Sequence, residues 1–242
     1  MMKSAFYSAV DAVSGFLGVA VSRRENTLGY HRRALLRALG VTVVLDVGAN
    51  IGQYARLLRK ARYHGVIVSF EPQEEAFRQL RNNSSGDPLH RCRQVALGDY
   101  SGDATLFVSR NSVSSSLRKV TQLSVAANAA TAAVGSLRVS VTSLDTVFPS
   151  EVGPTDVCYL KIDTQGFEAQ VLKGAAVVLP RVAAIEIELS LVALYEGQAL
   201  LPAVWKMLDQ GNFRPVWVER GFKEPNSGAL LQVDGLFVKR TD

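Results

Sequence analysis

The run VVLDVGANIG, from Val43 to Gly52, sets the architecture of the whole chain. Residues 41–47 are almost all β-branched or apolar, which predicts a buried strand. The glycines at positions 48 and 52 predict a tight turn, because glycine accepts backbone conformations that other residues avoid. The amphipathic stretch behind the turn, with Tyr54, Leu57 and Leu58, predicts a helix. Strand, glycine turn and helix in this order are typical of folds that bind a ligand over the turn.

Similar units follow along the chain. Strands that alternate with helices across short connections predict an α/β fold, with a mostly parallel sheet and helices on both of its faces. The last two strands, separated by a turn with glycine and proline, predict a late antiparallel pair. The further predicted strands are residues 65–70, 91–97, 157–162, 183–189, 213–218 and 236–239, and the predicted helices between them are residues 74–82, 167–173 and 205–209.

Residues 104–142 interrupt this alternation. They hold two alternating strands, ATLFVS and LRVSVTSL, a serine-rich stretch at 112–116 and an alanine-rich helix or loop near 125–134. We predict that the two strands pair with each other over a long connection. The expected organisation is therefore one domain over residues 41–242, with an insertion at about 104–142 after the third strand that serves as a lid or substrate loop.

Residues 1–40 form a separate N-terminal segment, which we expect to be helical and to pack on or beside the core. Within residues 5–21, apolar side chains recur at three- and four-residue steps, which predicts an amphipathic helix. This run contains Asp11 and is shorter than the about 20 apolar residues of a membrane span. The helix either packs on the protein or lies at a membrane interface. A second helix is predicted at residues 30–39, before Gly40.

Charge and composition narrow the classes of partner. The 27 Lys and Arg against 22 Asp and Glu give a net charge of +5, and arginines crowd the N-terminal segment. The basic residues lack interleaved aromatic side chains, which argues against nucleic acid and favours an anionic membrane surface or an acidic substrate. The cysteines and histidines lack the spacing of metal ligands, so neither a histidine-centred metal site nor a Ser-His-Asp hydrolase is indicated.

Acidic residues end two neighbouring predicted strands, Asp46 in the first and Glu71, within VSFEP, in the next. Asp46 would repel a pyrophosphate and attract a cation or a ribose hydroxyl, and the turn lacks the G-x-G-x-x-G pattern of dinucleotide sites. An acidic residue about 20 residues beyond the glycine turn accepts ribose hydroxyls in nucleotide-binding folds. The two carboxylates and the turn therefore predict a positively charged nucleoside-type ligand.

Residues 45–52, 69–72 and 161–172 together resemble the FkbM family of S-adenosylmethionine-dependent methyltransferases. The resemblance spans about residues 43–239 and rests on D-V-G-A-N-x-G, F-E-P, A-L-G-D and K-I-D-x-(E/Q)-G-x-E followed by V-L-x-G. It implies a Rossmann-like class I methyltransferase fold with a seven-stranded sheet, S-adenosylmethionine as cofactor, and O-methylation of a sugar or secondary-metabolite hydroxyl in bacteria. The acceptor we prefer is a deoxysugar of a cell-envelope glycolipid, methylated by a cytoplasmic enzyme at the inner face of the membrane.

The resemblance also implies which residues bind the cofactor. The glycine turn is expected to line its methionine end, Glu71 to hold the ribose, and the segment after the third strand to enclose the adenine. Asp99 in that segment also fits a simple turn residue. The full expected set is Asp46, Gly48, Asn50, Gly52, Tyr54, Glu71, Ala96, Leu97, Asp99 and Asp163.

Three carboxylates are candidate catalytic groups: Asp163, Glu168 and Glu186. Asp163 ends the fourth strand, at the edge where open α/β sheets present functional groups, and suits a general base or a metal ligand. Its alternative role is an N-cap of the following helix. Glu186 and Glu188 share one face of their strand, which either opens on the substrate cleft or is neutralised by Lys161.

Substrate contacts are expected from Ser115, Ser116, Gln165 and Glu188. Gln165 stands where the family more often has glutamate, which leaves a requirement for magnesium open. Two other classes of function also stay open. The fold could bind a nucleoside ligand as a non-catalytic interaction module, or it could be an NAD-dependent oxidoreductase, although Asn50 and the lack of G-x-G-x-x-G disfavour the latter.

Overall fold

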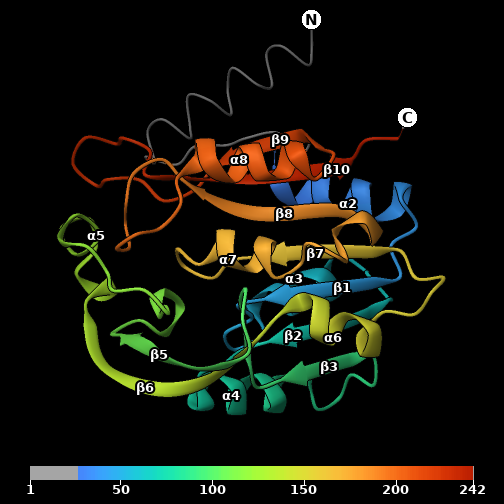
Figure 1. Ribbon diagram of the computed structural model, residues 1–242, viewed down its shortest axis with the longest axis horizontal. Coiled ribbons are helices and arrows are strands. Elements are labelled where there is room, and N and C mark those ends of the chain that lie inside the picture. The colour runs from blue at the N-terminus through green and yellow to red at the C-terminus, as the bar shows by residue number, and fades with distance from the viewer. Residues whose placement is uncertain (1–26, 242) are drawn as a thin grey trace, which may run out of the picture.

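The computed structural model describes residues 27–241 (Figure 1). The predicted amphipathic helix at residues 5–21 lies outside the described residues. The helices are α2 (Leu28–Ala38), α3 (Gln53–Lys60), α4 (Glu74–Ser84), α5 (Gln122–Ala127), α6 (Leu144–Glu151), α7 (Glu168–Lys173) and α8 (Leu201–Gln210), with short 3-10 turns η2 (Ser112–Ser114), η3 (Ala129–Thr131) and η4 (Leu179–Arg181). The strands are β1 (Val43–Val47), β2 (Val66–Phe70), β3 (His90–Arg93), β4 (Ala96–Leu97), β5 (Gly102–Ser109), β6 (Ala133–Thr142), β7 (Cys158–Ile162), β8 (Val182–Ser190), β9 (Phe213–Arg220) and β10 (Gln232–Lys239).

Seven strands form the central sheet, in the order β3-β2-β1-β7-β8-β10-β9. The pairs from β3 to β8 are parallel, and β10 runs antiparallel to both β8 and β9. The predicted mostly parallel sheet with a late antiparallel pair is therefore confirmed. The strand order reverses between β1 and β7, and the carboxyl ends of β1, β2 and β7 meet at one edge (Figure 1). Ligands of open α/β sheets bind at such an edge.

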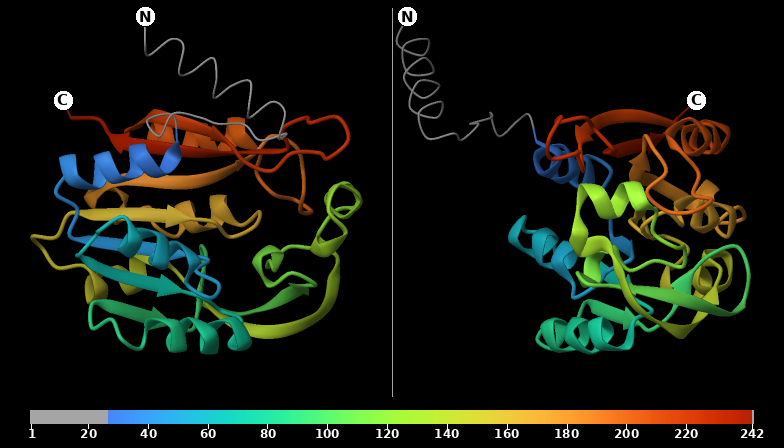
Figure 2. Two further views of the ribbon diagram at one scale, coloured as in Figure 1. Left: turned by 180° about the vertical axis from the view of Figure 1, so that it is seen from behind. Right: turned by 90° about the vertical axis from the view of Figure 1, so that its left-hand side faces the viewer.

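Helices cover both faces of this sheet, as the two views of Figure 2 show. α6, α7 and α8 lie on one face, where Phe148 and Leu172 pack with Leu45. α2, α3 and α4 lie on the other, where Leu36 and Leu58 pack with Val44. The side chains of β1 thus enter two cores in turn, which explains why its sequence is an almost continuous apolar run.

A second, three-stranded sheet with the order β4-β6-β5 is built largely from the insertion. β5 and β6 pair antiparallel, as predicted for the two alternating strands. The prediction of a single third strand at residues 91–97 is wrong. β3 stays in the central sheet, whereas β4 pairs parallel with β6 in the second sheet, so the chain changes sheets between Arg93 and Ala96. This change brings the insertion beside the carboxyl edge of the central sheet (Figure 1).

Side-chain caps mark the starts of α2 and α6, as well as that of α5. Thr27 accepts a hydrogen bond from the backbone N–H of Tyr30 at the start of α2, close to the predicted helix at 30–39. Ser143 caps α6 in the same way, and sequence analysis missed this helix because Pro149 within it breaks the helical pattern. Among residues 27–241, the structure contains no helix of the length and hydropathy that a membrane crossing requires.

Candidate active site

The glycine turn between β1 and α3 is built for a close backbone approach. Gly48, Asn50 and Gly52 have φ angles of 81°, 48° and 85°, in the left-handed region that favours glycine. A Cβ atom at Gly48 would lie 1.8 Å from the backbone oxygen of Asp163, so no other residue fits there. The turn is therefore pressed against the end of β7, and this contact places Gly48 and Asn50 beside Asp163 in one pocket.

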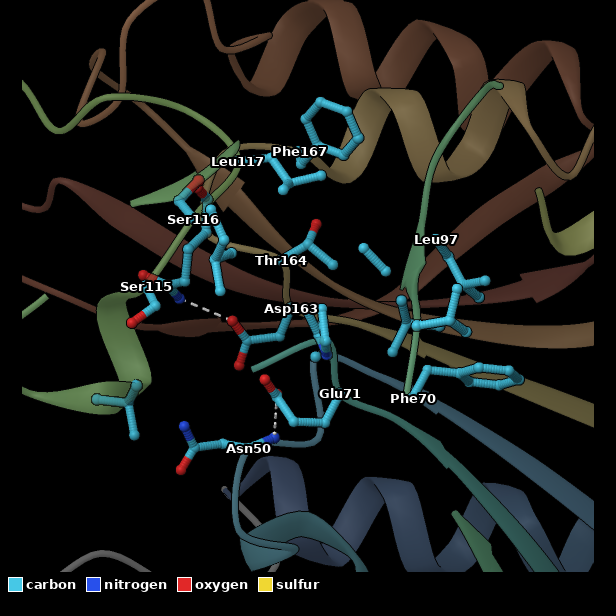
Figure 3. A pocket seen from close by; sticks show the side chains of 18 of the residues that line it. Asn50, Phe70, Glu71, Leu97, Ser115, Ser116, Leu117, Asp163, Thr164 and Phe167 are labelled. Carbon is cyan, nitrogen blue, oxygen red and sulfur yellow. Dashed lines mark hydrogen bonds between the residues drawn. The ribbon is translucent and has the colours of Figure 1, made fainter. Parts of the chain in front are cut away.

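Glu71, directly after β2, holds the turn from its other side. Its Oε2 accepts a hydrogen bond from the backbone N–H of Asn50 at 2.8 Å (Figure 3). Its Oε1 accepts one from the backbone N–H of Gln73 at 2.8 Å. Burial raises the pKa of Glu71 to about 7, against the lowering effect of these two hydrogen bonds. Each carboxylate oxygen keeps the capacity to accept a further hydrogen bond.

Asp163 follows the last residue of β7, and its side chain is 40% exposed. Its Oδ1 accepts a hydrogen bond from Gln165 Nε2 at 2.7 Å, and its Oδ2 lies 3.6 Å from Lys161 Nζ. The alternative role as an N-cap is wrong, because α7 begins at Glu168 and the residue at its cap position is Phe167. The Asp163 carboxylate instead points toward Glu71 and Asn50 (Figure 3).

These groups line one pocket, part of which is open to solvent. Polar and apolar side chains share the walls of the pocket, which is typical of small-molecule sites. The lining residues are Val47, Gly48, Asn50, Phe70, Glu71, Pro72, Val95, Ala96, Leu97, Leu106, Ser112, Val113, Ser115, Ser116, Leu117, Asp163, Thr164, Gln165 and Phe167.

The serine segment, residues 112–117, forms the wall contributed by the insertion. Ser116 Oγ donates to the backbone oxygen of Gln165 at 2.6 Å, and Ser112 Oγ lies 3.4 Å from Asn50 Oδ1. The hydroxyl of Tyr195 donates to the backbone oxygen of Ser114 at 3.1 Å. The insertion is thus tied both to the glycine turn and to the loop after β7, and it closes the pocket between them.

Nine of the predicted site residues meet in this pocket: Gly48, Asn50, Glu71, Ala96, Leu97, Ser115, Ser116, Asp163 and Gln165. Their roles toward a ligand stay predictions, but the structure brings together five segments that are far apart in the sequence. Other predicted site residues lie elsewhere.

Asp46 needs a correction, because it is fully buried beneath the turn rather than facing the pocket. Lys161 Nζ lies 3.2 Å from Asp46 Oδ1, and Ser69 Oγ donates to Asp46 Oδ2 at 3.2 Å. Burial alone would lower the pKa of Lys161, but the carboxylates of Asp46 and Asp163 raise it above its ordinary value. The buried ammonium of Lys161 therefore neutralises the charge of Asp46, which does not face a cationic ligand.

Glu186 and Tyr54 also need a correction. Glu186 forms a buried ion pair with Arg32 of α2 and accepts hydrogen bonds from Tyr54 at 2.9 Å and Tyr159 at 2.5 Å. Burial and the charge of Glu186 raise the pKa of both tyrosines well above its usual value, so their hydroxyls stay protonated and donate. This network lies under α2 and α3 and does not line the pocket. The neutralising residue is Arg32, and not Lys161 as predicted.

The remaining predicted residues outside the pocket have structural partners or are exposed. Glu168 Oε1 accepts hydrogen bonds from the backbone N–H groups of Thr164 and Gly166, so it shapes the loop after β7. Gly52 starts α3, and Asp99 is exposed beyond β4. Glu188 is placed behind Gln165, whose Nε2 lies 3.2 Å from Glu188 Oε2.

Sequence reasoning missed the apolar walls of the pocket. Phe70 stands next to Glu71 in the F-E-P motif, so the sequence did carry a signal for it. Leu106, Val113 and Leu117 come from the insertion, and no local pattern shows which insertion residues fold back over the turn. Within the part of the chain that the structure describes, no group of three or more His, Cys, Asp or Glu side chains is arranged to hold a metal ion.

Comparisons with known proteins agree with the resemblance. A family model described as "Methyltransferase FkbM domain" matches residues 46–215. The chain is 30% identical over 175 residues to 2-O-methyltransferase NoeI of Sinorhizobium fredii, an alignment that covers 69% of this chain and 70% of that relative. Similar solved structures include the METTL16 methyltransferase domain (TM-score 0.49, 11% identity, 88% of this chain and 67% of that one). Another is an rRNA methylase of Streptococcus thermophilus (TM-score 0.48, 12% identity, 92% and 100%).

Proposed function

The chain belongs to the FkbM family of S-adenosylmethionine-dependent methyltransferases, and we propose that it transfers the methyl group to a hydroxyl oxygen of a sugar or secondary-metabolite acceptor. The observation that carries this proposal is the position of Asp163. A half-exposed carboxylate stands in the same pocket as the glycine turn and Glu71, where it can take a proton from an acceptor placed against the cofactor.

The pocket fits S-adenosylmethionine. Glu71 offers two carboxylate oxygens for the ribose hydroxyls, and its backbone partners fix its orientation. Gly48 carries no side chain, which lets the backbone of Asp163 lie against the turn and places the two residues in one pocket. Apolar side chains of Phe70, Leu97 and Leu106 supply walls for the adenine ring. When bound, S-adenosylmethionine supplies an electrophilic methyl group on a positively charged sulfur.

Asp163 would act as the general base. Its carboxylate attracts positive charge, and it accepts the proton of the acceptor hydroxyl as the oxygen gains the methyl group, so that the product is a methyl ether. Lys161 contacts Asp163 from the buried side and Gln165 contacts it from the loop, and together they leave the carboxylate one direction of approach, toward the pocket. Positioning of this kind contributes much of the rate in two-substrate reactions.

The acceptor end of the pocket would lie along the serine segment. Ser115 and Ser116 line it together with Gln165, a set of short polar groups that suits hydroxyl-rich molecules. The NoeI relative is described as a 2-O-methyltransferase, which supports an oxygen acceptor. We propose a deoxysugar of a bacterial cell-envelope glycolipid as acceptor. Enzyme at the inner face of the membrane would then reach it, with the basic N-terminal segment as the membrane contact.

The first test is calorimetric titration with S-adenosylmethionine and S-adenosylhomocysteine, with and without magnesium. We expect micromolar binding by the native protein and a loss of about tenfold or more in Glu71→Ala, because a hydrogen bond to a charged group contributes about 1.5 to 3 kcal/mol. Glu75→Ala on the exposed side of α4 is the matched control and should bind as the native protein does. Absence of binding would favour the non-catalytic interaction module, and binding of NAD instead would favour the oxidoreductase.

The second test identifies the acceptor. Purified protein with radiolabelled S-adenosylmethionine is incubated with a panel of methyl glycosides and deoxyglycosides and with bacterial glycolipid extracts. Label in an alkali-stable methyl ether supports oxygen transfer to a sugar. Transfer only to free small molecules without a sugar would overturn the glycolipid proposal, and transfer to nitrogen would overturn O-methylation.

A further inference from the structure

We propose that Gln165 is the positioning residue of the acceptor site, whose amide bridges Asp163 and Glu188 and couples both to the insertion that closes the pocket. This inference rests on the proposed function, since it concerns how the base Asp163 is held. It assigns Gln165 a role toward Asp163 and not only toward the substrate.

The Gln165 side chain uses both of its donor hydrogens and one of its acceptor positions. Its Nε2 donates to Asp163 Oδ1 at 2.7 Å and to Glu188 Oε2 at 3.2 Å, and its Oε1 accepts from the Tyr195 hydroxyl at 2.8 Å. An amide has two donor hydrogens on nitrogen, and both are used on carboxylates of two different strands. The side chain is therefore fixed in one position between β7 and β8.

Tyr195 and the two carboxylates together set the orientation of the amide. The Tyr195 hydroxyl has one hydrogen and lies within hydrogen-bonding distance of two acceptors, Gln165 Oε1 at 2.8 Å and the backbone oxygen of Ser114 at 3.1 Å. Burial and the neighbouring acidic residues raise the pKa of Tyr195 above its ordinary value, so this hydroxyl stays protonated and can donate. A flipped amide would set the Oε1 atom against the carboxylates of Asp163 and Glu188. The amide nitrogen consequently always faces Asp163 and Glu188.

The charges around the bridge explain why a neutral donor matters there. Asp163 lies beside Lys161 of β7, but the groups that face it from the other elements are acidic or neutral: Glu71 after β2, Glu188 of β8, Glu168 of α7, Asp234 of β10 and the Tyr195 hydroxyl. Glu188 has a second neutral donor, Gln232 Nε2, at 2.7 Å. An acidic side chain at position 165 would add a further like charge between the carboxylates.

The backbone of Gln165 extends the same connection to the insertion. Its φ angle of 55° lies in the left-handed region, so the residue is turned out of the strand direction. Its carbonyl oxygen accepts the 2.6 Å hydrogen bond from Ser116 Oγ. Next to it, Gly166 packs so closely on Tyr195 that a Cβ would lie 2.9 Å from the Tyr195 Cβ. One residue thus joins the base, the second carboxylate and the serine segment.

The test is Gln165→Glu, which keeps the shape of the side chain and replaces the donor by a charge. We expect cofactor affinity within about twofold of the native value, because Glu71 and the glycine turn are untouched. The kcat for the best acceptor of the glycoside panel should fall about 10- to 100-fold at neutral pH, and the acid limb of its pH profile should move up by about one unit or more, because a like charge favours the protonated carboxyl.

Gln79→Glu is the matched control. Gln79 on α4 also donates to a glutamate, Glu75, at 2.8 Å, but on the exposed surface, where solvent screens the added charge. It should change neither kcat nor the pH profile. A native-like profile in Gln165→Glu, or an equal loss at every pH together with lost cofactor binding, would overturn the positioning role.

Tyr195→Phe is a second variant that tests the same proposal if Gln165→Glu fails to fold. It removes the hydroxyl that orients the amide and should lower kcat about 3- to 10-fold, with cofactor affinity unchanged. Unchanged kcat in this variant would overturn the proposal. Failure of the native protein to bind S-adenosylmethionine would instead overturn the proposed function, so the two failures are distinguishable.

Discussion

Glu186 and Glu188 stand two residues apart on β8 and on the same face, yet they belong to two different regions of the molecule. Glu186 lies in a sealed network under α2, with a guanidinium and two tyrosine hydroxyls as partners. Glu188 lies behind the pocket, and its partners are two neutral amides. Burial and the charges of Asp163, Glu168 and Asp234 raise the pKa of Glu188 well above its ordinary value.

The difference distinguishes a structural carboxylate from a functional one within the same strand. A cation at hydrogen-bonding distance, as in the network of Glu186, fixes the charge and joins a helix to the sheet. Neutral donors and acidic neighbours, as at Glu188, leave a group that is sensitive to protonation, which is the pattern of functional sites. We therefore assign the network under α2 to stability and the network at the carboxyl edge of the sheet to function.

Arg32→Met is expected to have the largest effect, a loss of stability caused by the unpaired Glu186. It leaves Glu186 without its cation in a buried position, and removing one partner of a buried ion pair costs about 3 to 5 kcal/mol. Urea denaturation would measure this loss in the free energy of unfolding. Arg78→Met, which removes the exposed partner of Glu75 on α4, should leave unfolding unchanged. A stability like that of the native protein in Arg32→Met would contradict the structural role of the sealed network.

Glu71→Gln tests the other side of the comparison, because a pocket carboxylate should affect binding more than folding. The variant should lose about 10- to 100-fold in affinity for S-adenosylmethionine, equivalent to about 1.5 to 3 kcal/mol. Since the pKa of Glu71 is about 7, the native affinity should weaken as the pH falls below that value and the carboxylate is protonated. Calorimetry at several pH values checks both effects, and a pH-independent affinity in the native protein would contradict them.

The sequence predicted the central sheet well because its signals are local. The apolar runs of β1 and β7 and the turn at Gly48 need no distant partner to be read, and they placed Asp163 and Glu71 at the correct edge. Long-range pairing was not readable. The Arg32 partner of Glu186 comes from the N-terminal segment, far away along the chain, so the alternative between cleft and ion pair stayed open until the structure showed it.

Asp46, the acidic residue of the glycine-turn motif, shows the same limit of prediction from the sequence. Asp46 was assigned correctly to the glycine-turn motif. Side chains alternate between the two faces of a strand, however, and that of Asp46 lies beside Lys161, the residue paired with it on β7. The pattern shows which residues a motif contains and not which face each one takes. The walls from the insertion, such as Leu106 and Val113, depend on the second sheet, which no motif encodes.

Glu188→Gln tests whether the charge of Glu188, unlike that of Glu186, makes the stability of the protein depend on pH. A carboxyl group whose folded pKa is raised binds more protons in the folded than in the unfolded state, so its stabilising effect is present at low pH and is lost as the pH rises above the unfolded value. The neutral variant removes this loss. We expect a stability close to native at acid pH and a higher stability than native at alkaline pH, measured by urea denaturation across the pH range. Glu186→Gln should behave differently, with lower stability throughout, because it gives up the charge that Arg32 pairs with.

Ser116→Ala is expected to have the smallest effect. It tests how much the pocket depends on the hydrogen bond between the insertion and the loop after β7. The variant removes the hydrogen bond from Ser116 Oγ to the Gln165 carbonyl, which is buried and contributes about 1 kcal/mol, and it leaves Asp163 and Glu71 untouched. The acceptor KM should rise about three- to fivefold with little change in cofactor affinity, because the serine segment faces the acceptor end. Ser150→Ala, which removes a hydroxyl bonded to the carbonyl of Val147 on exposed α6, is the control and should leave KM unchanged. If Ser116→Ala weakens cofactor binding as much as acceptor binding, the insertion closes over the whole pocket, and the division between its two ends must be abandoned.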